Sequence, residues 1–311
     1  MFSLWKKRRG AEPTTAQSAL AQSADTQSAA GQRPTANFGL GWDAYEIAAS
    51  VLTDVGCARE TNEDCGRFVS SADPQVTSRK GVLMIVADGV GGNSAGEIAS
   101  STAADVIGRV YYDHEGDTQL ALVDALRAAN GAIREAASVD PALAGMGTTC
   151  SALAVKGGFA FSANVGDSRV YLVREGQIYL MTEDDSVVGA MVKNGLLTRA
   201  QARKHPDKNV IISALGGGPE VSIRTWDAPL PLRLGDSFVV CSDGLYDLVK
   251  EEEIGEAVAA NAPGAACARL VALARERGGH DNITVGVLGV RPPDTSPRPQ
   301  ASETRELRWA Q

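Results

Sequence analysis

Acidic residues stand at the ends of short apolar runs in this chain, where a carboxylate has no obvious structural task. Asp88 follows GVLMIVA and precedes Gly89, and Asp243 follows SFVVCS and precedes Gly244. Asp281 stands just before ITVGVLGV. A single aspartate of this kind is explained as a turn or helix-cap residue. Asp243 in particular could serve merely as the N-cap of GLYDLVKEEE.

The repetition of the pattern favours metal binding. Glu63 and Asp64 in RETNED lie beside an early apolar run, and Asp167 lies in the tight turn of NVGDSRVY. Carboxylates that a fold brings together repel one another and need cations between them. Ligand sets made only of oxygen suit magnesium, manganese or calcium, not zinc. Two such ions about 4 Å apart can activate a water and polarise a phosphoryl group.

A phosphate-binding loop is the competing explanation for the glycine-rich stretch ADGVGGNSAGE. Gly91 and Gly96 have the spacing of a Walker loop, but Glu97 stands where that loop needs a lysine. Gly89 begins a dinucleotide-binding fingerprint, but Ser94 replaces its last glycine. Both departures disfavour a nucleotide-binding protein.

Composition excludes several other classes of protein. The formal net charge of -8 argues against a nucleic-acid partner. The five cysteines form no CxxC pair and are odd in number, which favours reduced thiols in a cytoplasmic protein. No apolar stretch is long enough to span a membrane.

The chain divides into one folded domain and two tails. Residues 11–40 consist mainly of Ala, Gln, Ser, Thr, Gly and Pro, which cannot bury enough apolar surface to fold. We therefore expect a disordered tail over residues 1–43 and a folded domain over 44–291. The prolines of RPPDTSPRPQ predict a flexible tail over 292–311.

Within the domain, strands come in runs and helices in pairs, which favours antiparallel sheets covered by helix layers. One helical pattern places Ile98, Ile107 and Val110 on one face, and the next places Leu126 and Ile133 on one face. A polar insert over 187–208 contains the capping box TRAQ. Strands are expected over 48–56, 64–70, 81–87, 148–155, 158–165, 169–181, 210–214, 221–226, 237–241 and 283–290.

Over roughly residues 50–290 the chain resembles the metal-dependent protein phosphatases of the PP2C (PPM) family, in their bacterial form. The resemblance rests on seven motifs in the order of the family. They are RETNED at 59–64, ADGVGG at 87–92, GTT at 147–149, NVGDSRVY at 164–171, ISALG at 212–216, CSDGLYD at 241–247 and GGHDNITV at 278–285.

The resemblance implies an α+β fold, an αββα four-layer sandwich of two central antiparallel sheets flanked by helix pairs. It implies hydrolysis of phosphoserine and phosphothreonine by direct attack of a hydroxide that bridges two Mn²⁺ or Mg²⁺ ions. The implied partners are phosphoproteins and a cognate serine/threonine kinase of bacterial signalling. The resemblance also favours a cytoplasmic monomer.

Carried over by position, the resemblance assigns Asp88 to both metals and the carbonyl of Gly89 to one of them. Asp243 and Asp281 would hold the other metal, and Arg59 would bind the substrate phosphate. Arg59, Asp88 and Asp243 are thus the expected catalytic residues. Glu63 and Asp64 would support the metal at Gly89. A third, weaker ion is assigned to Asp167, Asp243 and Asp247.

Three positions depart from the pattern of the family. Val90 stands where many members carry a histidine, as in bacterial forms. Asp185 replaces a histidine and Ser213 replaces an arginine, and both lie beside the insert at 187–208, which is the flap of the family. These changes concern substrate preference or flap position more than the metal core.

The alternative function is a catalytically weak, phosphatase-like module that only binds phosphoproteins. Such a module is expected to lack a core metal ligand, whereas Asp88, Asp243 and Asp281 are all present. The sequence therefore favours an enzyme.

Overall fold

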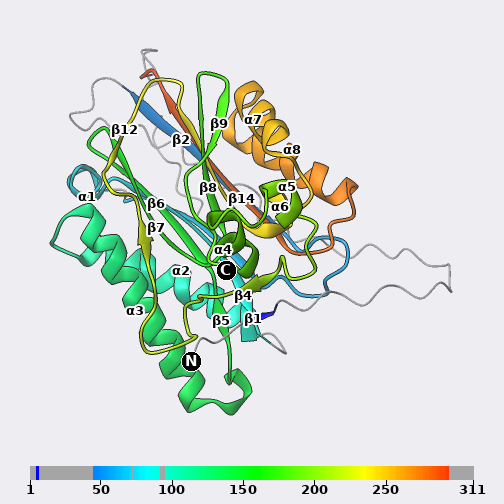
Figure 1. Ribbon diagram of the computed structural model, residues 1–311. Helices are drawn as coiled ribbons and strands as arrows, with labels where there is room; N and C mark the ends of the chain where they lie inside the picture. The colour runs from blue at the N-terminus through cyan, green and yellow to red at the C-terminus, as the bar shows by residue number, and fades with distance from the viewer. Residues whose placement is uncertain (1–4, 7–44, 72, 92–94, 294–311) are drawn as a thin grey trace, which may run out of the picture.

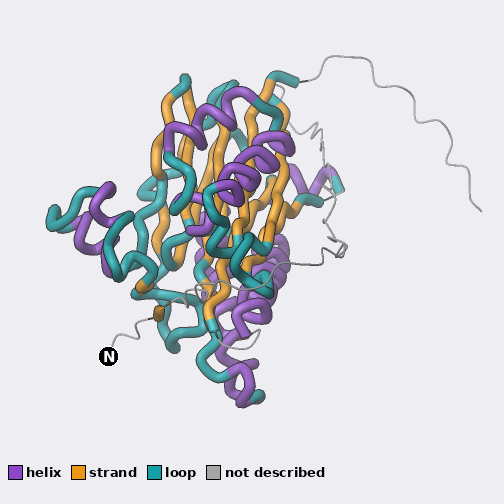
Figure 2. Tube along the Cα trace, turned by 90° about the vertical axis from the view of Figure 1, so that its right-hand side faces the viewer, coloured by secondary structure: helices purple, strands orange, loops and turns teal. Residues whose placement is uncertain are grey.

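The computed structural model describes residues 5–6, 45–71, 73–91 and 95–293 (Figure 1). Two antiparallel β-sheets pack face to face, and a pair of helices covers the outer face of each. Figure 2 shows the strands in the middle of the molecule with the helices around them. This arrangement is the predicted four-layer sandwich.

The first sheet has seven strands, in the order β11-β7-β6-β4-β3, with β12 paired to β7 and β5 paired to β4. Its central strand β4 is buried along its whole length, which explains its continuous apolar sequence. The bounds of the strands are β3 Asp64–Val69, β4 Val82–Val90, β5 Gly147–Thr148, β6 Cys150–Lys156, β7 Phe159–Val165, β11 Arg224–Thr225 and β12 Leu230–Pro231.

The second sheet has five strands, in the order β2-β14-β13-β8-β9. The β8–β9 hairpin turns at Glu175 and Gly176 as predicted, and both have the positive φ of a type I′ turn. Strand β2 pairs with β14 along its full length, which joins the two ends of the domain. The bounds are β2 Glu46–Asp54, β8 Arg169–Arg174, β9 Gln177–Leu180, β13 Ser237–Cys241 and β14 Ile283–Arg291.

Three apolar cores fill the spaces between the four layers. Helices α2 (Ala95–Asp113) and α3 (Thr118–Val139) pack on the first sheet, and α7 (Glu251–Ala260) and α8 (Pro263–Glu276) pack on the second. The middle core lies between the sheets and includes Met84, Phe238 and Leu288. The sheets approach closely there, because a Cβ on Gly286 would lie 2.5 Å from the sulfur of Met84.

The buried face of α2 contains the predicted Ile107, with Val110 packed against the same core, but it does not include Ile98. Ile98 is 40% exposed, whereas Ala99, Ala103 and Ile107 are buried. Helix α2 packs both on the first sheet and against its neighbour α3, and its inner face carries small side chains that permit close approach. In α3 the predicted residues Leu126 and Ile133 are buried.

The insert contains α4 (Val187–Lys193), α5 (Arg199–Ala202) and, after it, β10 (Val210–Ile211). The predicted capping box forms between Thr198 and Gln201. The strands predicted at 210–214 and 221–226 are only two residues long. The short elements that remain are α1 Pro74–Lys80, the 3₁₀ helix Pro141–Leu143 and α6 Asp243–Tyr246.

The predicted tails fall mostly outside the described residues. Trp5–Lys6 forms the short strand β1, which pairs with β10, so these two residues of the predicted disordered tail have a defined place. In the part of the chain that the structure describes, no helix is long and apolar enough to cross a membrane. All five cysteines are free thiols, and only Cys57 is exposed.

Candidate active site

The antiparallel register of the first sheet brings two of the predicted acidic residues together. Asp64 begins β3 and is paired with Asp88 near the end of β4. Both side chains are buried. The backbone of Asp88 is fixed by Thr149, whose side chain accepts from the Asp88 amide at 3.1 Å and whose amide donates to the Asp88 carbonyl at 2.9 Å.

The second sheet contributes two more carboxylates at the same end. Asp243 follows β13 and Asp281 precedes β14, and these strands are antiparallel neighbours. Ser242, not Asp243, occupies the N-cap position of α6, so the capping role considered for Asp243 does not hold. The Ser242 hydroxyl donates to Asp64 at 2.7 Å and thereby joins the two sheets beside the carboxylates.

Burial and like charge dominate the electrostatics of this cluster. Burial raises the pKa of Asp64 to about 7; hydrogen bonds from Ser242 and Thr284 oppose this, and the nearby charges of Asp281 and Asp243 add to it. Burial also raises the pKa of Glu63. The carboxylates therefore concentrate negative charge that a cation would stabilise.

Arg59 lies among these acidic side chains. Its Nη2 donates to Asp281 at 3.0 Å. Burial alone would lower the pKa of Arg59, but Asp281, and beyond it Glu63 and Asp88, raise it above the ordinary value. Its Nε is buried and has no hydrogen-bond partner among the described residues. The guanidinium thus has a charge-assisted bond to Asp281 and one N–H group that the described residues leave without a partner.

Gly89 occupies a position where three segments converge. Its amide donates to the Glu63 carbonyl at 3.0 Å. A Cβ on Gly89 would lie 2.2 Å from the Gly96 carbonyl oxygen and 2.5 Å from that of Glu63. A Cβ on Gly96 would in turn lie 2.9 Å from the Glu63 carboxylate. Only glycines allow the end of β4 and the start of α2 to pack against Glu63.

Asp167 lies in the turn between β7 and β8 and is buried. The hydroxyl of Tyr246 in α6 donates to the Asp167 carbonyl at 3.0 Å. The guanidinium of Arg169 lies 3.7 Å from the centre of the Tyr246 ring. These contacts hold the turn of Asp167 against the short helix that begins with Asp243.

Asp247 lies just beyond α6, with its amide bonded to the Asp243 carbonyl at 2.9 Å. Its carboxylate bonds to Lys208 of the flap, and the Nε2 of His280 lies 3.9 Å away. Burial would raise the pKa of Asp247, but His280 and Lys208 outweigh it and hold the pKa below its ordinary value. The carboxylate of Asp247 therefore faces the ammonium group of Lys208 and the imidazole of His280.

The donor set fits a hard divalent cation. Among the described residues, no group of three or more His, Cys, Asp or Glu side chains is placed so that it could hold a metal ion by itself. Magnesium-type sites do not need one, because these ions keep several waters and bind one or two carboxylates. The predicted ligands offer only oxygen donors, which is the chemistry that Mg²⁺ and Mn²⁺ prefer.

Comparison with known proteins agrees with this geometry. Residues 71–274 match the protein phosphatase 2C family. The chain belongs to this family. Protein phosphatase PhpP of Streptococcus pneumoniae is 36% identical to this phosphatase 2C chain over 251 residues, which cover 79% of the chain and 98% of PhpP.

A second relative of the phosphatase 2C chain is larger. Serine/threonine protein phosphatase PstP of Mycobacterium tuberculosis is 38% identical over 212 residues, which cover 67% of this chain but only 40% of PstP. A solved structure of the PstP catalytic domain, in complex with two manganese ions, has a TM-score of 0.67 at 34% identity. The match covers 79% of this chain and 98% of the PstP chain in that structure, which confirms the predicted fold.

The structure adds residues that the sequence reasoning did not assign to the site. Asn282 accepts from the Glu63 amide at 2.8 Å and donates to the carbonyls of Val55 and Thr61 at 2.9 Å each. It thereby fixes the RETNED segment of this phosphatase 2C domain beside Asp281. Its place within the motif GGHDNITV is the signal that could have revealed it.

One departure from the pattern of the phosphatase 2C family has a structural partner at the base of the flap. Asp185 accepts a hydrogen bond of 2.5 Å from Arg224 of β11, and its amide donates to the Gly166 carbonyl at 2.9 Å. Burial raises the pKa of Asp185, and Arg224 opposes the shift. Asp185 thus joins the start of the flap to the edge of the first sheet. No contact in the structure explains the departure at Ser213.

Proposed function

We propose that this chain is a metal-dependent protein phosphatase that hydrolyses phosphoserine and phosphothreonine. The observation that carries the proposal is the place of Arg59. Its guanidinium bonds to Asp281, experiences the charges of Glu63 and Asp88, and has a buried Nε with no hydrogen-bond partner among the described residues. An arginine among carboxylates suits a substrate that carries a phosphate and reacts beside divalent cations.

The residues that would hold two divalent ions are Asp88, the backbone of Gly89, Asp243 and Asp281, with Glu63 beside them. When bound, the ions supply Lewis acidity and lower the pKa of a water that can attack phosphorus. The sequence carries the same oxygen donors as the resemblance requires, and PstP binds two manganese ions. We therefore assign Mn²⁺ or Mg²⁺ as the cofactor.

Arg59 binds and orients the phosphate. A guanidinium can donate two parallel hydrogen bonds to two phosphate oxygens, and these bonds strengthen as negative charge grows in the transition state. Asp281 accepts from Nη2 of Arg59 and so restricts its orientation. Asp64 is held by Ser242 and Thr284; it would support the metal at Gly89 together with Glu63 and also keeps the ends of β3 and β13 together.

The wider role is proposed from the relatives. PstP and PhpP are named as protein phosphatases, so the substrates of this chain are phosphoproteins. We propose that it acts in the cytoplasm as a monomer and reverses a cognate serine/threonine kinase. The catalytic unit would be residues 44–291. Phosphoproteomics of a deletion strain and the sedimentation of the purified chain test these points.

Activity measurements distinguish an enzyme from a module that only binds phosphoproteins. We expect the purified chain to hydrolyse p-nitrophenyl phosphate and a phosphothreonine peptide with manganese, and to lose both activities with a chelator. Binding of the phosphopeptide without turnover at saturating manganese would instead support the binding module.

A further inference from the structure

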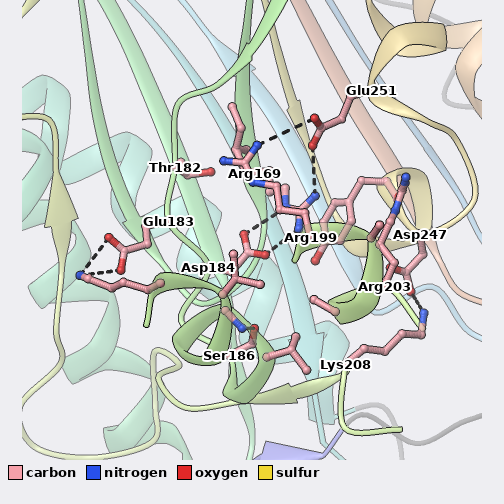
Figure 3. Close-up of a pocket in the computed structure, with 18 of the residues that line it drawn as sticks. Arg169, Thr182, Glu183, Asp184, Ser186, Arg199, Arg203, Lys208, Asp247 and Glu251 are labelled. Atoms are coloured by element: carbon pink, nitrogen blue, oxygen red, sulfur yellow. Dashed lines mark hydrogen bonds and ion pairs between the residues drawn. The ribbon is translucent and has the colours of Figure 1, made fainter. Parts of the chain in front are cut away.

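The flap rests on the helix that carries Asp243. A pocket of about 390 Å³ lies between the flap and the segment of α6 and α7, and cationic side chains of the flap line it (Figure 3). Arg203 donates to the carbonyl of Val249 at 2.8 Å and also bonds to the carbonyl of Tyr246. Lys208 reaches the carboxylate of Asp247. These contacts attach the end of the flap to the segment that follows Asp243.

The Lys208–Asp247 pair is more enclosed than the other ion pairs of the flap. The side chains are 19% and 7% exposed, respectively. Arg199, by contrast, is 62% exposed and lies 4.0 Å from Glu251. A charge pair that is largely removed from water interacts more strongly than an exposed one.

Asp247 belongs to the neighbourhood of the metal centre. It follows Asp243 by one helical turn, and its amide bonds to the Asp243 carbonyl. His280, whose Nε2 lies 3.9 Å from the carboxylate of Asp247, directly precedes Asp281 in the sequence. Asp247 therefore lies between the flap and the two aspartates that we assign to a metal.

We propose that the ammonium group of Lys208 and a divalent ion compete for the carboxylate of Asp247. The proposal rests on the metal-dependent function proposed above. Contact between Lys208 and Asp247 holds the flap against α6, and binding of an ion at Asp247 releases it. Because coupling between two equilibria is reciprocal, flap docking weakens ion binding at Asp247 to the same extent.

The test compares Lys208→Met, which removes the charge and keeps an apolar stem, with Lys208→Arg, which keeps the charge. Manganese binding is measured by titration calorimetry on the full chain. We expect the weakest manganese site to bind roughly tenfold more tightly in Lys208→Met, within the usual range for coupled sites. Lys208→Arg and the matched flap variant Arg199→Met should bind like the wild type.

A double-variant cycle assigns the gain to Asp247. Lys208→Met combined with Asp247→Asn should lose the gain, because the carboxylate for which the two cations compete is gone. Thermal unfolding gives a second readout: in chelator, Lys208→Met should melt below the wild type, and manganese should raise its Tm more than that of the wild type. An unchanged weakest site in Lys208→Met, or a gain that persists in the double variant, would overturn the proposal.

Flap mobility gives an independent measurement on the wild-type chain. Hydrogen exchange over residues 198–208 should become faster as manganese is raised beyond saturation of the tight sites, and in Lys208→Met it should be fast throughout. Exchange that slows with manganese would contradict the competition. Manganese-dependent turnover by the wild type is measured separately, so a failure of this inference leaves the proposed phosphatase activity standing.

Discussion

At the scale of single residues, the site contains several buried acidic side chains and fewer cationic side chains. Arg59 compensates Asp281, and Lys208 compensates Asp247. Asp64 is raised in pKa to about 7 by its burial and by its acidic neighbours. Neutralising one of these carboxylates therefore removes charge that we expect divalent cations to need.

The first prediction concerns Asp88 and Asp243. Asp88→Asn and Asp243→Asn should each abolish turnover, by about 10³-fold or more, because a metal-dependent reaction without a protein nucleophile has no alternative route. Manganese-dependent hydrolysis of a phosphopeptide measures this, and circular dichroism checks that the domain is folded. Near-wild-type activity of either folded variant at saturating manganese would refute the assignment.

The second prediction concerns Arg59. Arg59→Ala should raise KM for a phosphopeptide, because the phosphate loses a charge-assisted partner worth about 1.5–3 kcal/mol. Arg59→Lys should recover part of the affinity, since a lysine keeps the charge but not the paired geometry. An unchanged kcat/KM in Arg59→Ala would make Arg59 a structural partner of Asp281 only.

The third prediction separates two roles of Asp167. If Asp167 is a ligand of a weak third ion, the variant Asp167→Ala should have lower activity toward a phosphopeptide, and millimolar manganese should restore part of that activity. If Asp167 only shapes the turn, Asp167→Ala should lower the Tm of the chain and leave its response to manganese unchanged. Melting curves and manganese titrations on one preparation decide between these outcomes.

At the scale of elements, the end of β4 and the start of α2 determine how the acidic residues lie. The carboxylate of Glu63 packs against Gly96, and the carbonyl of Glu63 packs against Gly89. Gly89 has no room for a side chain, because the atoms that a Cβ would meet belong to the backbone, whereas a Cβ on Gly96 would first meet the carboxylate of Glu63. These glycines are required by packing, not by a phosphate.

The fourth prediction follows from that contact. Gly89→Ala should destabilise the fold by about 1–3 kcal/mol, the cost usual for overpacking, and should weaken manganese binding. Gly131→Ala is the matched control: Gly131 lies in α3, a Cβ added there would meet nothing within 4 Å, and alanine is the better helix former. Chemical denaturation of both variants measures the difference. A Gly89→Ala chain as stable as Gly131→Ala would contradict the close packing.

At the scale of the whole molecule, the acidic site that we assign to the metal ions joins the two sheets. Its acidic residues come from β3 and β4 of one sheet and from the ends of β13 and β14 of the other. The formal net charge of the chain is -8, so that divalent cations at this junction also reduce the overall repulsion. We therefore expect global stability to depend on the ions.

The fifth prediction is the size of that dependence. Manganese at about one hundred times its Kd should stabilise the folded chain by about 2.7 kcal/mol, which corresponds to a Tm higher by about 5–10 °C than in chelator. Differential scanning calorimetry measures the shift. Asp88→Asn should lose most of it. A Tm that is the same in chelator and in manganese would show that the ions are not linked to folding.

The sequence by itself determined the order of the elements, the hairpin at Glu175, the capping box at Thr198 and the acidic residues of the site. These features are local: apolar periodicity, turn residues and short motifs each depend on neighbours along the chain. The seven motifs also sufficed for the family. The sequence could not predict that Ile98 of α2 faces outward, because the pattern does not say which face meets both the sheet and α3.

Only the tertiary structure decided which groups surround each acidic residue. Asp64 meets Ser242, and Glu63 meets Asn282, across separations of 178 and 219 residues. Lys208 meets Asp247 because the flap folds back onto α6. Contacts of this kind depend on how two sheets and an insert pack together, and specific polar contacts between distant segments leave no periodic trace in the sequence. Because these contacts set the charge around each acidic residue, the tertiary structure also decides the electrostatics of the site.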